Sequence, residues 1–333
     1  MSTLRDVAKL AGVAPITVSR VINDAGYASD ATRKRVRLAI KKLGYVPNSL
    51  ARSLRSRRTS TLALVVTDIT NPFFTLIARS VEDTASAAGY SVIFCNTDES
   101  ETKEEEYLTI LLQKQVDGIL LVPACTNTRS VRRIQAQGTA VVLLDRRIPG
   151  AATDTVRGDS EGGAYQLTQL LLGLGHRQIA VLTGPKNIST AYDRVTGYRK
   201  ALADAGVRPS SKLVYYGAFD QASGFEMARK AMAAPEPPTA LFAANNFIAL
   251  GAIHAMEAAG CRVPQDLALV AFDDLPPALV TFPFITAAAQ PAYEMGRLAT
   301  NLLLARLAGS RSHKEVVLPC EINVRQSSGG PRP

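Results

Sequence analysis

Residues 3–23 read TLRDVAKLAGVAPITVSRVIN, and this stretch contains the strongest helix signals of the N-terminal part of the chain. Thr3, followed by Asp6, predicts a capping box at the start of a first helix. Gly12 predicts the end of that helix. Pro15 predicts the start of a second helix, because the N–H that proline lacks would be unpaired at that position. The apolar positions of the first helix recur at helical spacing and are Leu4, Val7, Ala8 and Ala11.

A third helix is predicted from about Ser29 to Leu43, and it completes a small helical unit. Its inward side is predicted to be Val36, Ala39, Ile40 and Leu43. In the second helix, Val18, Val21 and Ile22 are predicted to face inward, whereas Ile16, Thr17, Ser19 and Arg20 stay outside. Two helices joined by a tight glycine turn and backed by a third form a helix-turn-helix unit, whose second helix enters the major groove of DNA.

The positive charge of the chain is concentrated in the same region. Residues 1–60 hold 13 Lys and Arg against three Asp, a net charge of +10, whereas the remaining residues hold 25 Lys and Arg against 26 Asp and Glu, a net charge of −1. This asymmetry indicates a nucleic-acid-binding module joined to a nearly neutral domain. Charge alone leaves open the alternative of a basic face that is merely solvated.

Residues 47–60, PNSLARSLRSRRTS, are predicted to form a hinge between the two parts. Pro47 is predicted to end the third helix. The segment is short and basic, with Leu50, Ala51 and Leu54 on one side, and alone it is too short to hold a helix in water. A disordered linker is the alternative interpretation.

Beyond the hinge, apolar runs alternate with amphipathic helical stretches. The runs are LALVV (62–66), SVIFC (91–95), GILLV (118–122), AVVLL (140–144), IAVLT (179–183), ALFAA (240–244) and LALVAF (267–272). The alternation predicts an α/β domain of parallel sheets flanked by helices, and two sheets fit about 260 residues better than one. In such sheets, ligands bind at the carboxyl ends of the strands.

Polar and aromatic residues follow these predicted strands and are candidates for a ligand site. They are Asn71, Phe73, Phe74, Asp145, Arg146, Asn245, Asp273 and Gln290, with Arg194 and Phe219 expected to face the cleft from the second lobe. Aromatic faces cover the C–H faces of a sugar, while carboxylates, guanidinium groups and amides chelate its hydroxyls. The alternative roles are a helix start at Asn71-Pro72, core packing of Phe73 or Phe74, and capping by Asp145, Asp273 or Asp274.

Other classes of function find little support. Cys95, Cys125, Cys261 and Cys320 lie far apart, as do the three histidines, so neither a disulfide framework nor a metal site is predicted. Gly173-x-Gly175 lacks a third glycine, and no P-loop or Ser–His–Asp grouping appears, so we expect no enzyme activity and no cofactor. No apolar run reaches about 18 residues, and residues 1–12 lack the apolar core of a signal peptide. A cytoplasmic protein without a membrane partner is therefore expected.

The runs LRDVAKLAGVAPITVSRVIN (4–23) and YVPNSLARSLRSRRT (45–59) resemble the N-terminal signature and the hinge of the LacI/GalR family of bacterial transcription regulators. The resemblance continues along almost the whole chain. It implies a helix-turn-helix headpiece (1–46), a hinge helix or linker (47–60), an effector-binding and dimerisation domain (61–325) and a flexible tail (328–333). The N-lobe would be about 61–159 and 290–319, and the C-lobe about 160–289 and 320–327, with crossings near Asp159, Ala289 and Pro319.

The resemblance also implies which residues contact DNA. Pro15, Ile16 and Arg20 match base-reading positions, and Arg20 suits this role on chemistry alone, because its fork pairs with guanine O6 and N7. The other implied DNA-binding residues are Thr3, Arg5, Thr17, Ser19, Asn23, Asn48, Ala51, Arg52, Leu54 and Arg55. In the family, paired hinges fold in the minor groove and a leucine, here Leu54, wedges into a base step. The family usually has Ser where this chain has Ala14. The loss of that helix cap costs about 0.5–2 kcal/mol.

The effector domain is similar to the periplasmic sugar-binding proteins, and to those for ribose in particular. All ten candidate ligand residues match positions that contact the sugar there, whereas Asn246 departs from the usual Asp. The resemblance implies a homodimeric repressor of a catabolic operon that binds a pseudo-palindromic operator and responds to ribose or a related monosaccharide. A nucleoside, a sugar acid or a sugar phosphate remains open as effector, as does co-repression. A sugar-binding protein without a regulatory role is the alternative of another class.

Overall fold

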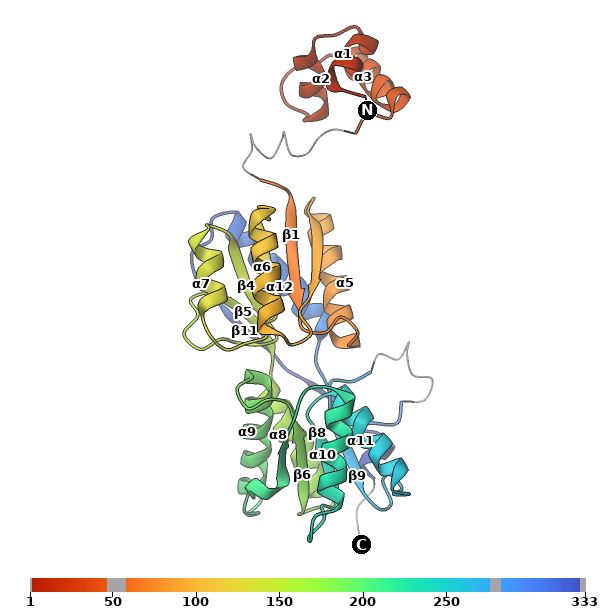
Figure 1. The fold of residues 1–333 in the computed structure, drawn as a ribbon, viewed down its shortest axis with the longest axis vertical. Coiled ribbons are helices and arrows are strands. Elements are labelled where there is room, and N and C mark those ends of the chain that lie inside the picture. The colour runs from red at the N-terminus through yellow and green to blue at the C-terminus, as the bar shows by residue number, and fades with distance from the viewer. Residues whose placement is uncertain (1, 47–57, 276–282, 330–333) are drawn as a thin grey trace. The chain divides into compact units, whose positions relative to one another are not determined.

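The computed structural model describes residues 2–46, 58–275 and 283–329, which form two compact units divided between Thr59 and Ser60. The first unit contains the three predicted helices, α1 (Leu4–Ala11), α2 (Pro15–Ile22) and α3 (Asp30–Leu43) (Figure 1). Val7, Val18 and Val36, one from each helix, are fully buried and form the centre of its core. The helix-turn-helix prediction is therefore confirmed.

The residue that stops α3 differs from the prediction. The helix ends at Leu43 as expected, but Gly44, with φ 56°, closes it by donating its backbone N–H to Ile40 and Lys41. A glycine adopts this left-handed conformation without the steric cost of a Cβ atom, so it ends the helix before Pro47 is reached. Pro47 and the hinge candidates Asn48, Ala51, Arg52, Leu54 and Arg55 lie outside the described residues.

The second unit contains two six-stranded sheets, which confirms the predicted fold class. The first sheet has the order β11-β5-β4-β3-β1-β2 and comprises β1 (Thr61–Val66), β2 (Ser91–Asn96), β3 (Gly118–Leu121), β4 (Ala140–Leu144), β5 (Asp154–Gly158) and β11 (Glu315–Leu318). The second has the order β12-β10-β9-β8-β6-β7 and comprises β6 (Ile179–Thr183), β7 (Val214–Tyr216), β8 (Ala240–Ala243), β9 (Ala268–Phe272), β10 (Thr286–Ala289) and β12 (Glu321–Asn323). The described strand pairs are parallel except β10 with β12.

Helices cover both faces of each sheet, as Figure 1 shows. The first sheet is covered by α5 (Pro72–Ala87) and α12 (Ala292–Leu307) on one face and by α6 (Glu101–Gln113) and α7 (Arg129–Ala136) on the other. The second sheet is covered by α8 (Ser160–Gly173) and α9 (Ser189–Asp204) on one face and by α10 (Gln221–Met232) and α11 (Asn246–Ala258) on the other. Two short 3-10 turns, η1 (Ser211–Leu213) and η2 (Gln326–Ser328), complete the described elements.

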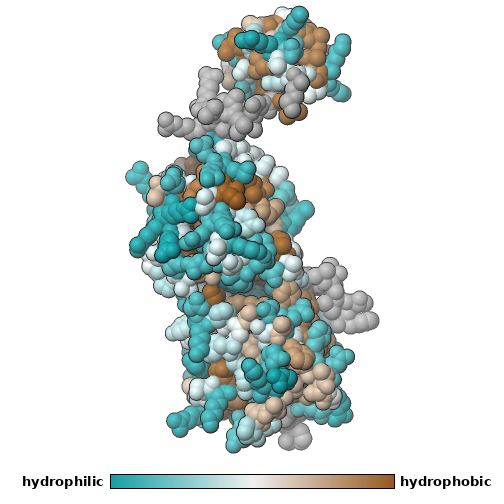
Figure 2. Space-filling view, in the orientation of Figure 1, coloured by the Kyte–Doolittle hydropathy of each residue, from teal (hydrophilic) through white to brown (hydrophobic). Residues whose placement is uncertain are grey.

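The chain passes between the two sheets at three places. It crosses after β5 at Asp159, between β10 and α12 at residues 290–291, and between β11 and β12 at residues 319–320. Each sheet therefore belongs to a separate lobe built from segments that are distant in the sequence. The first lobe shows a largely hydrophilic face in Figure 2.

Three of the strands that the apolar runs did not predict, β7, β11 and β12, form sheet edges. A strand at an edge buries only part of its side chains, so its sequence does not need a continuous apolar run, although the fourth edge strand, β2, has one. In β11, for example, EVVL alternates between exposed and half-buried residues. Another, β5, lies next to β11 and reads DTVRG, with Asp154 buried in an ion pair with Arg306.

The C-terminal segment is ordered further than predicted. Ser327 and Ser328 are fully buried, and the Ser327 hydroxyl donates to the Leu269 carbonyl at 2.6 Å and accepts from the Thr286 backbone at 2.8 Å. The prediction of a flexible tail from residue 328 is therefore wrong at that residue. Small hydroxyl side chains are typical of a tail in the sequence, but here they close the end of the second sheet.

Gly197 is required for the close packing of α8 against α9. A Cβ atom there would lie 2.1 Å from the Glu161 carbonyl oxygen and 2.9 Å from the Tyr165 nitrogen, both of them backbone atoms. Because the backbone cannot move aside cheaply, we expect Gly197→Ala to lower the free energy of unfolding by at least about 1–3 kcal/mol. Urea unfolding followed by circular dichroism measures this change.

Gly173 provides the matched control, since nothing lies within 4 Å of its added Cβ atom and it belongs to α8. Gly173→Ala is expected to raise stability by about 0.4–1 kcal/mol, because alanine restricts the unfolded chain. Equal unfolding midpoints for the two variants would contradict the packing argument.

Candidate functional site

A cavity of about 440 Å³ lies between the two lobes, at the carboxyl ends of the parallel strands. Nine of the ten candidate ligand residues line it, namely Asn71, Phe73, Phe74, Asp145, Arg146, Arg194, Phe219, Asn245 and Asp273. The tenth, Gln290, lies behind the lining and donates from Nε2 to Asp273 Oδ1 at 2.7 Å. The tertiary structure thus brings together residues that are more than 200 positions apart in the sequence.

Two buried aspartates occupy equivalent places in the two lobes. Asp145 follows β4 and Asp273 follows β9, and both adopt a left-handed backbone, with φ 63° and 65°. Each donates its backbone N–H to the neighbouring strand, Asp145 to Val156 at 2.8 Å and Asp273 to Ala288 at 3.0 Å. Residues other than glycine are uncommon in this backbone conformation, which costs them about 1–3 kcal/mol. Such strain clusters at functional sites.

Burial makes both carboxyl groups unusually weak acids. Burial raises the pKa of Asp145 to about 6, although the charges of Arg146 and Arg194 lower it. Burial also raises the pKa of Asp273, against the lowering effects of Arg194 and of the hydrogen bond from Gln290. Asp145 Oδ1 is buried without a hydrogen-bond partner among the described residues. This oxygen is therefore available to a ligand, which the loop-capping alternative does not explain.

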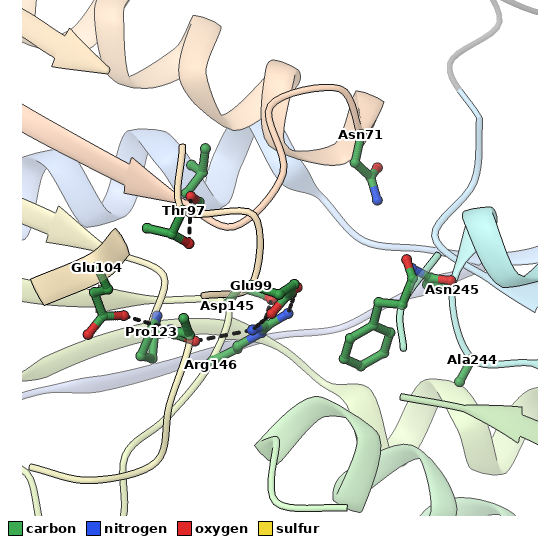
Figure 3. A network of polar contacts seen from close by, with 12 residues as sticks. Asn71, Thr97, Glu99, Glu104, Pro123, Asp145, Arg146, Ala244 and Asn245 are labelled. Carbon is green, nitrogen blue, oxygen red and sulfur yellow. Dashed lines mark hydrogen bonds and ion pairs between the residues drawn. The ribbon is translucent and has the colours of Figure 1, made fainter. Parts of the chain in front are cut away.

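The two arginines of the cavity are each held by protein groups. Arg146 donates from Nη2 to Glu99 Oε1 and from Nη1 to Glu99 Oε2, both at 2.6 Å, and from Nη1 to the Pro123 carbonyl at 3.1 Å (Figure 3). Arg194 stacks 3.8 Å from the Phe272 ring centroid and donates to the Ala244 carbonyl. The Nε atom of each arginine is buried and has no hydrogen-bond partner within the described part of the chain. The Nε–H of each guanidinium group is thus a donor that none of the described residues uses.

Asn71 starts a helix, as one of the alternatives predicted, and it also lines the cavity. Its Oδ1 caps α5 by accepting from Phe73 N at 3.0 Å, so it is also a helix start. Its Nδ2 donates to Asn246 Oδ1 at 3.1 Å, while Asn246 Nδ2 donates back to Asn71 Oδ1 at 3.0 Å. This reciprocal amide pair joins the first lobe to the second. The departure from Asp at position 246 therefore has a structural consequence, because a carboxylate could not donate back.

The aromatic residues also combine core and cavity roles. Phe73 and Phe74 are buried in the core of the first lobe, with their ring centroids 5.0 Å apart in an edge-to-face arrangement, and both line the cavity. Phe219 lines it from the second lobe, with its ring centroid 5.4 Å from the Arg146 guanidinium carbon. Asn245 caps α11 through Ile248 N and donates to the Phe219 carbonyl at 3.2 Å. Aromatic faces and hydrogen-bonding groups thus alternate around the cavity.

Eight residues of the cavity lining were not predicted from the sequence, and two of them, Thr67 and Glu99, place buried or paired polar groups at the cavity. Thr67 directly follows β1, and its hydroxyl is buried without a partner within residues 58–275 and 283–329. The strand-end rule that found Asp145 applies equally to this residue. Glu99 lies in the acidic run TDES after β2, which is typical of a solvated loop until Arg146 is placed beside it.

The raised pKa values predict how effector binding varies with pH. Between the unfolded value near 3.8 and the folded value near 6, the folded protein holds a proton on Asp145 that the unfolded chain releases. This group therefore stabilises the ligand-free fold at low pH, and the contribution is lost as pH rises through 6. A ligand hydroxyl donates a stronger hydrogen bond to the ionised carboxylate of Asp145 than to the neutral acid, so its affinity should fall on acidification.

We therefore expect the ligand-induced rise in melting temperature to be larger at about pH 7.5 than at about pH 5. Thermal unfolding with and without ligand at the two pH values measures this difference. A rise that is larger at the lower pH would contradict the role of an ionised Asp145.

The predicted DNA-contacting residues within the described headpiece lie on α1 and α2. Pro15, Ile16 and Arg20 are exposed together on α2, with Ile16 55% exposed. Thr17 and Ser19 are half-buried, and Asn23 donates to the Ser19 carbonyl at 2.8 Å, which supports the end of α2. Thr3 and Arg5 lie at the start of α1, where Thr3 and Asp6 form the predicted capping box. Ala14 precedes α2 without a side-chain cap.

Two family models match the chain along most of its length. The family described as "Bacterial regulatory proteins, lacI family" matches residues 3–48, and the one described as "Periplasmic binding proteins and sugar binding domain of LacI family" matches residues 59–325. The chain belongs to the LacI family of bacterial regulators. Members of the LacI family are DNA-binding repressors rather than enzymes, and they bind operator DNA and a small-molecule effector and form dimers.

Individual LacI-family proteins resemble the chain over nearly its whole length. The HTH-type transcriptional repressor PurR of Photobacterium profundum is 33% identical, with 98% of each chain covered. The ribose operon repressor of Escherichia coli (strain K12) is 37% identical and covers 92% of this chain and 93% of its own. The crystal structure of the Lac repressor dimer bound to operator and the anti-inducer ONPF matches this chain with a TM-score of 0.87 at 27% sequence identity. The match covers 98% of this chain and 99% of that chain.

Neither a membrane span nor a metal site is found in the part of the LacI-family chain that the structure describes. Within residues 2–46, 58–275 and 283–329, none of the helices has the length and apolar character needed to span a membrane. Over the same ranges, no cluster of three or more His, Cys, Asp or Glu side chains is arranged to hold a metal ion.

Proposed function

We propose that this protein is a repressor of a catabolic operon whose affinity for DNA is controlled by a monosaccharide, ribose or a close relative. One observation carries the sugar assignment. The buried polar atoms at the cavity that lack partners among the described residues include acceptors and donors together, namely Thr67 Oγ1, Asp145 Oδ1, Arg146 Nε and Arg194 Nε. Only a ligand whose groups both donate and accept satisfies all of them, and a sugar hydroxyl does both.

The shape of the cavity supports the same ligand class. Phe73, Phe74 and Phe219 offer apolar surfaces for the C–H faces of a sugar ring, while Asp145 and Asp273 approach from the two lobes. The similarity to the ribose operon repressor agrees with this assignment. A nucleoside is the second candidate, because its aromatic base would stack on the same rings.

We propose that effector binding acts on DNA through the closure of the two lobes. Closure is governed by contacts between the lobes, including the Asn71–Asn246 pair and the bidentate ion pair of Arg147 with Asp193. In a dimer on a pseudo-palindromic operator, lobe closure would set the spacing of the two headpieces. A coupling of about 1–3 kcal/mol would change operator affinity by one to two orders of magnitude. A cytoplasmic location follows from the proposed DNA target.

A thermal-shift screen of the full-length protein tests the effector assignment. The probes are pentoses, hexoses, sugar acids, sugar phosphates and nucleosides at equal concentration. A pentose or hexose that gives the largest rise in melting temperature supports the proposal, because a ligand that binds only the native state stabilises it. A response to nucleosides alone would replace the sugar by the second candidate and leave the regulator assignment intact.

The competing class, a sugar-binding protein without a regulatory role, differs in its behaviour toward DNA. We expect the full-length protein to select a pseudo-palindromic sequence from random DNA, and the selected affinity to change when the effector is added. Absence of any selected sequence would favour the non-regulatory class.

A further inference from the structure

Glu99 is a residue of the cavity lining that the sequence did not single out, and it pairs with one of the two arginines there. It follows β2 and adopts a left-handed backbone, with φ 58°, directly after Asp98, whose φ is 52°. This strained turn directs its carboxylate toward Arg146, and Figure 3 shows the guanidinium group beside it. The cost of such a backbone is sustained only where the surrounding structure fixes it.

The carboxylate of Glu99 occupies the outer edge of the Arg146 guanidinium group. Three of the five N–H groups of Arg146 donate to Glu99 and to the Pro123 carbonyl. The remaining inner edge carries Nε, which lies 3.8 Å from Asp145 Oδ2. Arg146 is therefore placed between two carboxylates, and the two-pronged edge with which an arginine usually receives a carboxylate or phosphate is already filled.

Arg194 also lies beside a carboxylate, although without a bidentate hydrogen bond. Its Nη1 lies 3.6 Å from Asp273 Oδ2 and donates to the Ala244 carbonyl. The charged groups lining the cavity are then two arginines against six carboxylates, the latter being Asp68, Asp98, Glu99, Asp145, Asp220 and Asp273. The arginines are the cationic groups of this lining, and neither offers an uncompensated charge to a ligand.

We propose that Glu99 determines the charge specificity of the cavity: by pairing with Arg146, it admits neutral polyhydroxyl ligands and excludes sugar acids and sugar phosphates. This inference rests on the proposed function, because it concerns the same cavity. A negatively charged ligand would enter a field of net negative sign in a largely buried space, where a like charge at hydrogen-bond range costs more than in water. A hydroxyl needs only single donors and acceptors, which Arg146 Nε and Asp145 Oδ1 provide.

Matched sugar pairs that differ in charge test the proposal. Isothermal titration calorimetry of the full-length protein would compare D-ribose with D-ribose 5-phosphate, and D-glucose with D-glucuronate. We expect the wild type to prefer the neutral member of each pair that binds. Glu99→Gln should reduce that preference about tenfold, because it removes one negative charge near the ligand.

Two further variants separate charge from structure. Glu99→Asp keeps the negative charge and should retain the preference for neutral sugars. Glu106→Gln removes the same charge from an exposed position on α6 that does not line the cavity, and should leave the ratio unchanged. A variant that only disturbed the fold would weaken both members of a pair alike, so the ratio of dissociation constants is the deciding quantity.

The possible failures are distinguishable. If the wild type binds the anionic sugar more tightly, or if Glu99→Gln leaves the ratio unchanged, the role of Glu99 is overturned while the sugar-controlled regulator stands. If the wild type binds none of the four sugars, the proposed monosaccharide effector falls, and the inference about Glu99 falls with it.

Discussion

The Asp273→Asn variant is expected to bind its sugar about 100-fold more weakly than the wild type, because it loses two charge-assisted hydrogen bonds. Asp273 lies in the cavity with its carboxylate between Arg194 and Gln290. Asparagine keeps the size of the side chain and tolerates the left-handed backbone that Asp273 adopts at φ 65°. The variant therefore removes the charge but still allows the local backbone conformation. Asp273→Ala would also remove the charge, but alanine would be strained in that conformation.

The measurement is calorimetric titration with the sugar that gives the largest thermal shift, with circular dichroism to verify folding. Asp266→Asn is the matched control, because Asp266 pairs with Arg262 at the surface and does not line the cavity. An affinity of Asp273→Asn within a few-fold of the wild type would remove Asp273 from the proposed site. Loss of affinity in the control as well would indicate a general effect on the fold.

Arg20→Ala is expected to weaken binding to the selected operator by about 10- to 100-fold, which corresponds to about 1–3 kcal/mol for one bidentate base contact. Arg20 is exposed near the end of α2, the helix that enters the major groove in a helix-turn-helix unit. Binding to unrelated DNA depends chiefly on phosphate contacts, so it should fall much less.

Arg5→Ala supplies the comparison, because Arg5 is exposed on α1 and is expected to contact the DNA backbone. It should weaken operator and unrelated DNA alike and reduce the slope of affinity against salt by about one. Fluorescence anisotropy with both DNAs at several salt concentrations separates the two patterns. If Arg20→Ala lost affinity equally for both DNAs, it would be a phosphate contact rather than a base reader.

The helices of the headpiece could be predicted from local sequence signals alone. The capping residue Thr3, the glycine stop at Gly12 and the apolar spacing around Val7 and Val36 predict helices that the structure contains. These signals act within one or two helical turns, so they are readable without the fold. The stop of α3 is local too, since Gly44 carries the left-handed conformation, but Pro47 is the more conspicuous signal in the sequence.

Three of the edge strands and the C-terminal segment could not be predicted from the hydrophobic periodicity of the sequence. The strands β7, β11 and β12 and the buried Ser327 and Ser328 have no apolar run, because their burial depends on a neighbour supplied from elsewhere in the chain. β11, for example, pairs with β5 across more than 150 positions of sequence. No window of sequence contains both partners, so such elements depend on the tertiary contacts.

The amino-acid pattern was sufficient to predict the two sheets, the helical headpiece and nine residues that line one cavity, because parallel strands present their carboxyl ends on a common side. Which charges face each other in that cavity depends on the folded domain. The pairing of Glu99 with Arg146, the Asn71–Asn246 link between the lobes and the buried Thr67 hydroxyl arise between segments that only the fold brings into contact. Electrostatic and hydrogen-bond energies depend on distances of a few ångströms, and those distances are set by the packing of the whole domain.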